Sequence, residues 1–136
     1  MTPNKIIIHH SLTKDSQTVS WGAIRRYHIE TMGWDDIGYQ WGIELVNDHY
    51  EILMGRRPDQ IGAHTIGQND ESIGICVVGN YDIDPVPNTL KEAIQKLLTW
   101  LIIEYKIPSK AIYGHCQFAP KTCPGKNMME WLETIR

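Results

Sequence analysis

The chain has 136 residues, of which 42% are hydrophobic and 21% charged, and its formal net charge is −3. This length suits a single domain over residues 1–136, and the composition is that of an ordinary globular protein. The charge balance gives no sign of a basic surface, and no stretch approaches the roughly 18 uninterrupted apolar residues of a membrane helix. We therefore expect no nucleic-acid partner and no membrane insertion.

The N-terminal part predicts a strand and then a helix. The apolar run in Lys5–Ile8 is typical of a buried strand. It is shorter than the roughly 7–15 apolar residues of a signal-peptide core, so we expect synthesis in the cytoplasm without a signal peptide. Ser20 can then cap a helix over residues 21–32, with Ile24, Tyr27 and His28 on one face.

The middle of the chain predicts a hairpin, a loop and a central strand. Residues 39–45 and 50–53 are suited to two strands joined by a turn. Residues 55–71 show no clear period and are predicted as a long loop, a kind of segment that is often functional in compact domains. Residues 73–78 predict a continuous apolar strand at the centre of a sheet, in which Cys76 behaves as a buried small hydrophobe.

The C-terminal part predicts two helices on either side of a short strand. Thr89 and Glu92 form a capping-box pattern at the start of a helix that runs to Tyr105. Residues 111–114 are predicted as a strand, and Asn127 can cap a last helix. Because helices and strands interleave, the predicted fold class is α/β: a single domain with a central mixed β-sheet flanked by α-helices.

Two histidines and a cysteine stand where a metal site can form. His9 follows one predicted strand and His115 follows another, and α/β proteins place their sites at such strand ends. Cys123 comes soon after His115, across a proline-containing segment that can loop back toward it. Two imidazoles and one thiolate make three zinc ligands and leave a fourth position for water, as in catalytic zinc sites. On spacing alone, purely structural histidines and a structural cysteine remain the alternative.

Several short segments extend this pattern over most of the chain. In chain order they are Ile7-Ile8-His9-His10-Ser11, Gly33-Trp34-Asp35-Asp36-Ile37-Gly38-Tyr39, Gly62-Ala63-His64, Ser72-Ile73-Gly74-Ile75, Gly114-His115 and Ala119-Pro120-Lys121-Thr122-Cys123-Pro124-Gly125. Together they resemble the zinc N-acetylmuramoyl-L-alanine amidases, a family that includes phage lysozyme-type endolysins and peptidoglycan recognition proteins. The resemblance runs from about Lys5 to Trp131.

The resemblance assigns roles to individual residues. It implies that His9, His115 and Cys123 hold one Zn²⁺ per chain and that Tyr39 and Lys121 are the polar catalytic pair. It also implies a mixed sheet with flanking helices and a groove over the metal. The implied reaction is hydrolysis of the amide between N-acetylmuramic acid and L-alanine, with peptidoglycan or a muropeptide as substrate.

Two positions qualify the match. Some bacterial members of the wider family carry a catalytic glutamate in the strand matched here by Ser72–Cys76, and this chain has Cys76 at that place. The sequence is therefore closer to the phage endolysin branch, in which Tyr39 and Lys121 share the work. His10 has no ligand role in the match and is expected to support the site or the fold.

The long loop and the cellular setting complete the expectations. His64 and Asn69 are predicted to contact the peptide stem or sugar, although an ordinary polar loop is equally compatible with them. The expected setting is a phage or prophage endolysin that reaches the wall after release through a membrane lesion. Action on muropeptides in the cytoplasm is the alternative setting.

Three other functions compete with the amidase. The first is a module of the same fold that binds muropeptides without cutting them. The second is a cysteine hydrolase with Cys116 or Cys123 as nucleophile. The third is a structural zinc site with His10 or Cys116 as a fourth ligand. The odd number of cysteines does not decide among them, since free thiols suit both a reducing compartment and a metal site.

Overall fold

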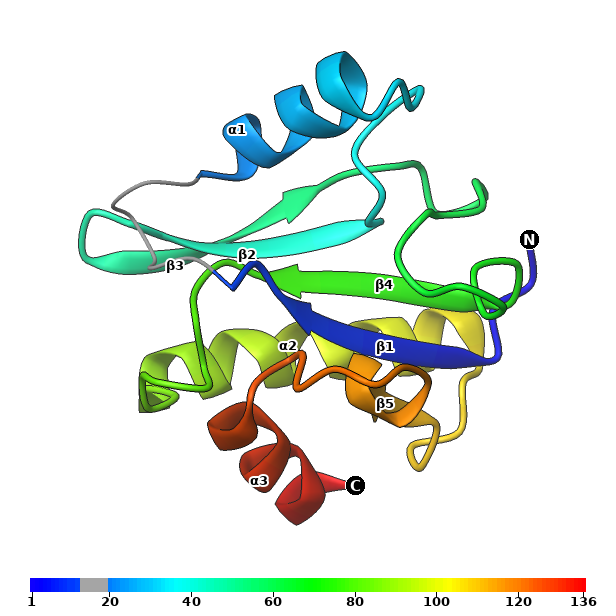
Figure 1. Ribbon diagram of the computed structural model, residues 1–136. Helices are drawn as coiled ribbons and strands as arrows, with labels where there is room; N and C mark the ends of the chain where they lie inside the picture. The colour runs from blue at the N-terminus through cyan, green and yellow to red at the C-terminus, as the bar shows by residue number, and fades with distance from the viewer. Residues whose placement is uncertain (13–19) are drawn as a thin grey trace.

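The computed structural model describes residues 1–12 and 20–136, and these residues form a five-stranded sheet between helices (Figure 1). The strands are β1 (Lys5–His10), β2 (Trp41–Val46), β3 (His49–Met54), β4 (Ser72–Val77) and β5 (Ile112–Gly114). Their order is β3-β2-β4-β1-β5. Strand β3 runs antiparallel to β2, whereas the other neighbours pair in parallel. The predicted α/β class with a central mixed sheet is confirmed.

Helices cover both faces of this sheet. The short helix α1 (Trp21–Arg26) lies on one face, and α2 (Asn88–Tyr105) and α3 (Lys126–Ile135) lie on the other (Figure 1). A π-helical turn, η1 (Tyr27–Thr31), continues α1, and a 3₁₀ turn, η2 (His115–Gln117), follows β5. None of the helices in the described residues is long and apolar enough to cross a membrane.

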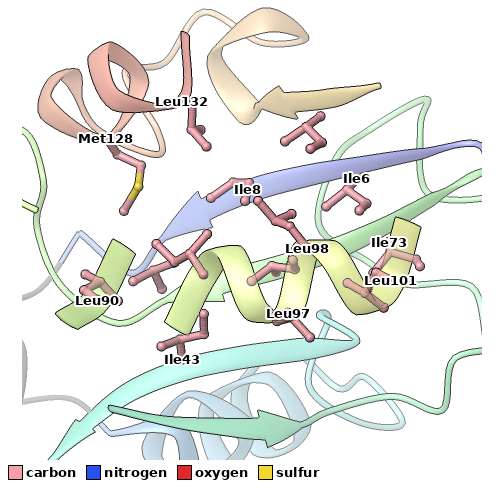
Figure 2. Close-up of a cluster of buried hydrophobic side chains, with 14 of the residues drawn as sticks. Ile6, Ile8, Ile43, Ile73, Leu90, Leu97, Leu98, Leu101, Met128 and Leu132 are labelled. Carbon is pink, nitrogen blue, oxygen red and sulfur yellow. The ribbon is translucent and has the colours of Figure 1, made fainter. Parts of the chain in front are cut away.

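The main core fills the space between the sheet and helices α2 and α3. Figure 2 shows isoleucines of the strands facing leucines of α2 and two side chains of α3: Ile6, Ile8, Ile43, Ile73, Leu90, Leu97, Leu98, Leu101, Met128 and Leu132. Each fully buried leucine or isoleucine contributes roughly 1.5–3 kcal/mol relative to exposure. Because side chains alternate along a strand, Ile6 and Ile8 point into this core while Ile7 and His9 point to the opposite face.

A smaller cluster lies on the face that α1 covers. Its buried members are Trp21, Ile37 and Cys76, and the burial of Cys76 confirms the expectation for that thiol. Gly42 of β2 makes this packing feasible, since a Cβ at that position would lie 2.3 Å from the Trp21 ring. Polar side chains are buried on the same face, namely His9 near the end of β1 and Ser72 at the start of β4.

The first helix begins where the sequence predicts it and then changes type. The hydroxyl of Ser20 accepts a hydrogen bond from the main-chain N–H of Ala23 at 3.1 Å, as expected of a cap. The predicted helix over residues 21–32 is α-helical only as far as Arg26, and Tyr27–Thr31 is π-helical. Hydrophobic spacing does not distinguish the two windings over so few residues.

Both predicted caps of the later helices are wrong. Helix α2 starts one residue before Thr89, at Asn88, and its cap residue is the extended Pro87, so Thr89 already lies in the first turn and no capping box with Glu92 forms. Helix α3 likewise starts before Asn127, whose side chain donates instead to the carbonyl of Asp84 at 2.9 Å.

The cap of α3 comes from a distant part of the chain. A carboxylate oxygen of Asp82 accepts the main-chain N–H of Lys126 at 3.0 Å, across 44 positions of sequence. A negative charge at a helix N-terminus stabilises the unpaired N–H groups and the helix dipole. A cap that comes from so far away leaves no local pattern in the sequence.

Residues 55–71 form the long loop that the sequence predicts, without helix or strand. Arg56 fixes its start, because its guanidinium donates to the carbonyls of Ile37 at 2.9 Å and Ile61 at 2.7 Å. The loop then crosses β4 and brings His64 over the same sheet face as His9.

Candidate active site

The three predicted metal ligands meet at the carboxyl ends of β1 and β5. Ile8 pairs with Gly114 in parallel register, so His9 and His115, each one residue further on, are neighbours, with ring centroids 4.5 Å apart. Cys123 reaches them from the loop before α3, and its Sγ lies 3.8 Å from His9 Nδ1 across 114 positions of sequence. One ligand atom from each residue lies within 4.8 Å of the others.

The loop that carries Cys123 is held at several points. The N–H of Cys116 donates to the carbonyl of Cys123 at 2.6 Å, and the hydroxyl of Thr122 donates to Asp82 at 2.7 Å. The main-chain N–H of His10 points at the sulfur itself, 3.4 Å from Sγ. Asp82 therefore serves both the cap of α3 and the loop that aims the thiol at the histidines.

Burial sets the protonation of these groups. It lowers the pKa of His9 well below its usual value, helped by the nearby His64 and His115. Burial and the Lys121 ammonium also lower the pKa of His115. Both imidazoles are therefore neutral near pH 7, as metal ligation requires. Burial raises the pKa of Cys123 to about 11, so its thiol keeps its proton unless a cation displaces it.

Tyr39 and Lys121 lie beside the three ligands. The ring of Tyr39, just before β2, is 5.1 Å from that of His9, and both Tyr39 and Lys121 line the same cavity of about 530 Å³ as the ligands. Burial, followed by the nearby Cys76 and Cys123, raises the pKa of the Tyr39 phenol well above its usual value. The phenol is thus a hydrogen-bond donor at neutral pH, whereas Lys121 supplies an exposed cationic head.

His64 and Asn69 occupy different places. His64 lines the cavity, but its Nδ1 lies 3.0 Å from His9 Nε2, and its Nε2 lies 3.5 Å from the hydroxyl of Ser72. The side-chain oxygen of Asn69 accepts the main-chain N–H groups of His64 and Thr65 at 2.9 and 2.8 Å. Asn69 is not among the residues that line the cavity. A substrate contact by either residue stays a prediction.

The remaining candidates lie outside the ligand group. Nδ1 of His10 accepts the N–H of Tyr81 at 3.1 Å. Among the described residues, neither His10 nor Cys116 belongs to the cluster of potential metal ligands. That cluster has three members, which fits an open catalytic site better than a closed structural one.

Two residues of the cavity wall were not predicted to line the site, although one was placed on a helix face and the other lies in a segment of the family resemblance. His28 and Trp34 line the cavity, with their rings 4.6 Å apart, and Nδ1 of His28 accepts the N–H of Gly38 at 2.9 Å. The π-helical turn carries His28 to this place, and π-turns are frequent at functional sites. No pattern in the sequence indicates that turn.

The sequence matches the N-acetylmuramoyl-L-alanine amidase family over residues 1–126. The chain belongs to this amidase family. The amidase is 31% identical over 135 residues to the endolysin of Klebsiella phage KP32, a match that covers 96% of this chain and 85% of the phage protein. The predicted family and enzyme class, an N-acetylmuramoyl-L-alanine amidase, are thereby confirmed.

Solved structures agree with this assignment. The amidase aligns with N-acetylmuramoyl-L-alanine amidase LysC from Clostridium intestinale URNW at a TM-score of 0.83 and 26% identity, covering 98% of this chain and 84% of that one. A Drosophila PGRP-LB variant, solved in complex with tracheal cytotoxin, aligns at a TM-score of 0.82 and 27% identity over 98% of this chain and 82% of that chain.

Proposed function

We propose that the protein is a zinc-dependent amidase in which His9, His115 and Cys123 hold one Zn²⁺ and Tyr39 and Lys121 assist the reaction. The bond cut is the amide between N-acetylmuramic acid and L-alanine of peptidoglycan. The observation that carries the proposal is the meeting of three ligand atoms within 4.8 Å of one another in a cavity that Tyr39 and Lys121 also line.

The donor set suits zinc. Two neutral imidazoles and a thiol are the ligand types that zinc prefers, and three protein ligands leave a position for water or substrate. When bound, Zn²⁺ supplies a Lewis acid and lowers the pKa of a coordinated water to about 7. The main-chain N–H of His10, 3.4 Å from the Cys123 sulfur, supports the thiolate form of that ligand.

Lys121 has the charge that the reaction needs. Attack on an amide carbonyl places negative charge on the carbonyl oxygen, and the Lys121 ammonium stands two residues before Cys123 at the wall of the cavity. Its field already lowers the pKa of both His9 and His115, so it reaches the ligand cluster electrostatically. We therefore assign Lys121 to stabilisation of the oxyanion.

Tyr39 contributes a proton-bearing group. Because its pKa is raised, the phenol holds its proton at neutral pH and can donate a hydrogen bond to the reacting groups. The same shift disfavours a role as a phenolate base. Tyr39 thus orients the attacking water or passes a proton toward the leaving amine.

The substrate and setting rest on relatives. Proteins of this fold have been solved with tracheal cytotoxin, a monomeric diaminopimelic acid-type peptidoglycan, and the phage relative is an endolysin. We propose peptidoglycan or its muropeptides as substrate, and a phage or prophage endolysin as the biological role.

A digest of purified peptidoglycan tests this function. We expect new N-terminal L-alanine, loss of that signal with a chelator, and its return with added zinc. Metal analysis of the purified protein is expected to give about one zinc per chain. Full cleavage by a protein shown to be free of metal would falsify the zinc mechanism.

A further inference from the structure

One ligand, His9, has both of its ring nitrogens engaged. Its Nδ1 edge faces Cys123, and its Nε2 lies 3.0 Å from His64 Nδ1 and 3.3 Å from the hydroxyl of Thr65. A neutral imidazole carries its hydrogen on one nitrogen and a lone pair on the other. Metal ligation through Nδ1 therefore requires the hydrogen of His9 on Nε2.

The hydrogen bonds on the far side of His64 determine whether His9 Nε2 or His64 Nδ1 is the donor in the contact between the two rings. The hydroxyl of Ser72 lies 2.6 Å from the carbonyl oxygen of Gln68, and since a carbonyl can only accept, the Ser72 hydrogen points there. The Ser72 oxygen is then an acceptor for His64 Nε2, 3.5 Å away.

The position of the hydrogen on His64 then determines the position of the hydrogen on His9. With its hydrogen on Nε2, His64 presents the lone pair of Nδ1 to His9. Nε2 of His9 must donate to it, which leaves the His9 Nδ1 lone pair facing Cys123. Thr65 fits either direction, because its hydroxyl, 3.0 Å from His64 Nδ1, can both donate and accept. The carbonyl of Gln68 thus fixes the tautomer of a metal ligand two side chains away.

The surroundings hold the His64 ring in one place. Gly74, the β4 partner of Ile7, lies beneath it, and a Cβ there would be 2.5 Å from the imidazole. On the loop side, a Cβ at Gly62 would likewise lie 2.7 Å from the imidazole of His64. The carboxamide of Asn69 fixes the main chain of His64 through its N–H group. A loop residue is thereby as firmly placed as a residue of the sheet.

We propose that His64 is a positioning residue that, through Ser72 and the carbonyl of Gln68, keeps the hydrogen of His9 on Nε2 and presents Nδ1 to the metal. This inference rests on the proposed zinc function and adds His64 as the residue that orients the ligand His9. Outer partners of metal-binding histidines typically change metal affinity about 10–100-fold when removed.

Zinc affinity, measured by competition with a chromophoric chelator, gives the main test. We expect His64→Ala to bind zinc about 10–100-fold more weakly than the unchanged protein. His64→Asn, which offers an acceptor oxygen near the place of Nδ1, is expected to recover most of the affinity. His49→Ala removes an exposed histidine of the β2–β3 hairpin and is the matched control, with unchanged affinity.

A second measurement reads the tautomer without metal. In the zinc-free protein, ¹⁵N spectra of the imidazoles are expected to show His9 protonated on Nε2. In His64→Ala and in Ser72→Ala the His9 signals are expected to shift toward a mixture of tautomers. Circular dichroism and thermal unfolding of each zinc-free variant identify any that fail to fold, and His64→Asn then carries the comparison.

The outcomes separate this inference from the zinc function. Wild-type zinc affinity in a folded His64→Ala, with His9 still protonated on Nε2, overturns the positioning role. A variant with intact zinc affinity and a raised KM alone also overturns it and makes His64 a substrate contact. If the unchanged protein cleaves peptidoglycan without binding zinc, the proposed function itself fails.

Discussion

The two faces of the sheet bury different kinds of side chain. Toward α2 and α3, β1 contributes Ile6 and Ile8 to a core of apolar residues (Figure 2). Toward α1 the same strand contributes Ile7 and then His9, which lies among hydrogen-bonded polar groups such as Thr65 and His64. The apolar face is stabilised by the removal of apolar area from water, and this stabilisation tolerates substitution by other apolar residues of similar volume. The polar face requires a partner for each buried group.

This difference teaches that stability and chemistry are separable in this domain. Substitutions on the α2 face are expected to change the free energy of unfolding and leave the chemistry of the folded fraction alone. Substitutions among the polar groups of the other face are expected to change zinc binding or catalysis in the folded protein. The following predictions test that separation.

The largest effect is expected from loss of a ligand. Cys123→Ala removes the thiolate, so zinc binding and release of N-terminal L-alanine are both expected to disappear while the zinc-free protein still folds. Cys116→Ala is the matched control, because this thiol lies outside the ligand cluster and its loss leaves cleavage intact. Cleavage at the normal rate by Cys123→Ala would exclude the proposed site.

Removal of the cation beside the ligands is expected to slow catalysis without removing zinc. For Lys121→Ala we expect kcat to fall about 10²–10³-fold, the usual result of losing one oxyanion-stabilising donor. Lys126→Ala, also an exposed lysine of the same segment, serves as the control. Steady-state kinetics on a muropeptide together with zinc titration provide the test. An unchanged kcat in a zinc-loaded Lys121→Ala removes this residue from the mechanism.

On the apolar face the effect is expected in stability alone. Leu101 of α2 is fully buried, so Leu101→Ala is expected to lower the free energy of unfolding by about 2–5 kcal/mol. Ile103, on the same helix, is 72% exposed, and Ile103→Ala is expected to stay within about 0.5 kcal/mol. Urea unfolding measures both. A lower kcat/KM of folded Leu101→Ala would show that the two faces are not separable.

Acidification is expected to lower stability through the buried histidines. The folded-state pKa of His64 is lowered to about 4 by burial, and those of His9 and His115 are lowered too. Histidines in the unfolded chain have a pKa of about 6.5, so below that pH the unfolded chain binds more protons than the folded one. The stability that these neutral histidines provide is thus fully present above about pH 6.5, and the part due to His64 is lost toward about pH 4, by up to about 1.4 kcal/mol per pH unit.

Urea unfolding of the zinc-free protein at several pH values measures this decline. His64→Asn lacks one of the shifted groups and is expected to show a shallower dependence on pH. Equal slopes in the two proteins would indicate that His64 is not buried in its neutral form.

The meeting of His9, His115 and Cys123 could be predicted only in part from local signals, and the choice of these three as proposed ligands came from the resemblance to the amidase family. His9 and His115 directly follow apolar strand residues, and parallel pairing of β1 with β5 makes such positions neighbours. The fold class followed from the order of the elements. The caps of α2 and α3 could not be predicted, because Pro87 and the distant Asp82 replace the expected side chains.

The contacts that surround His9 and line the cavity also could not be predicted from the sequence. His64 was expected to face substrate, and its contact with His9 arises only because the loop crosses Gly74 of β4. Likewise, His28 reaches the cavity through a π-turn that has no sequence signature. Contacts that depend on how a loop lies over a sheet are non-local and leave no periodic pattern.

The distance along the chain between His9 and Cys123 has a consequence for folding. These residues stand 114 positions apart, so their ligand atoms approach only after β1, β4 and β5 have paired and the loop before α3 has closed. A partly folded chain has no such site. A bound ion therefore stabilises only the complete native state, by an amount that grows with free zinc concentration. The melting temperature of the protein is expected to rise with added zinc, and that rise to vanish in Cys123→Ala.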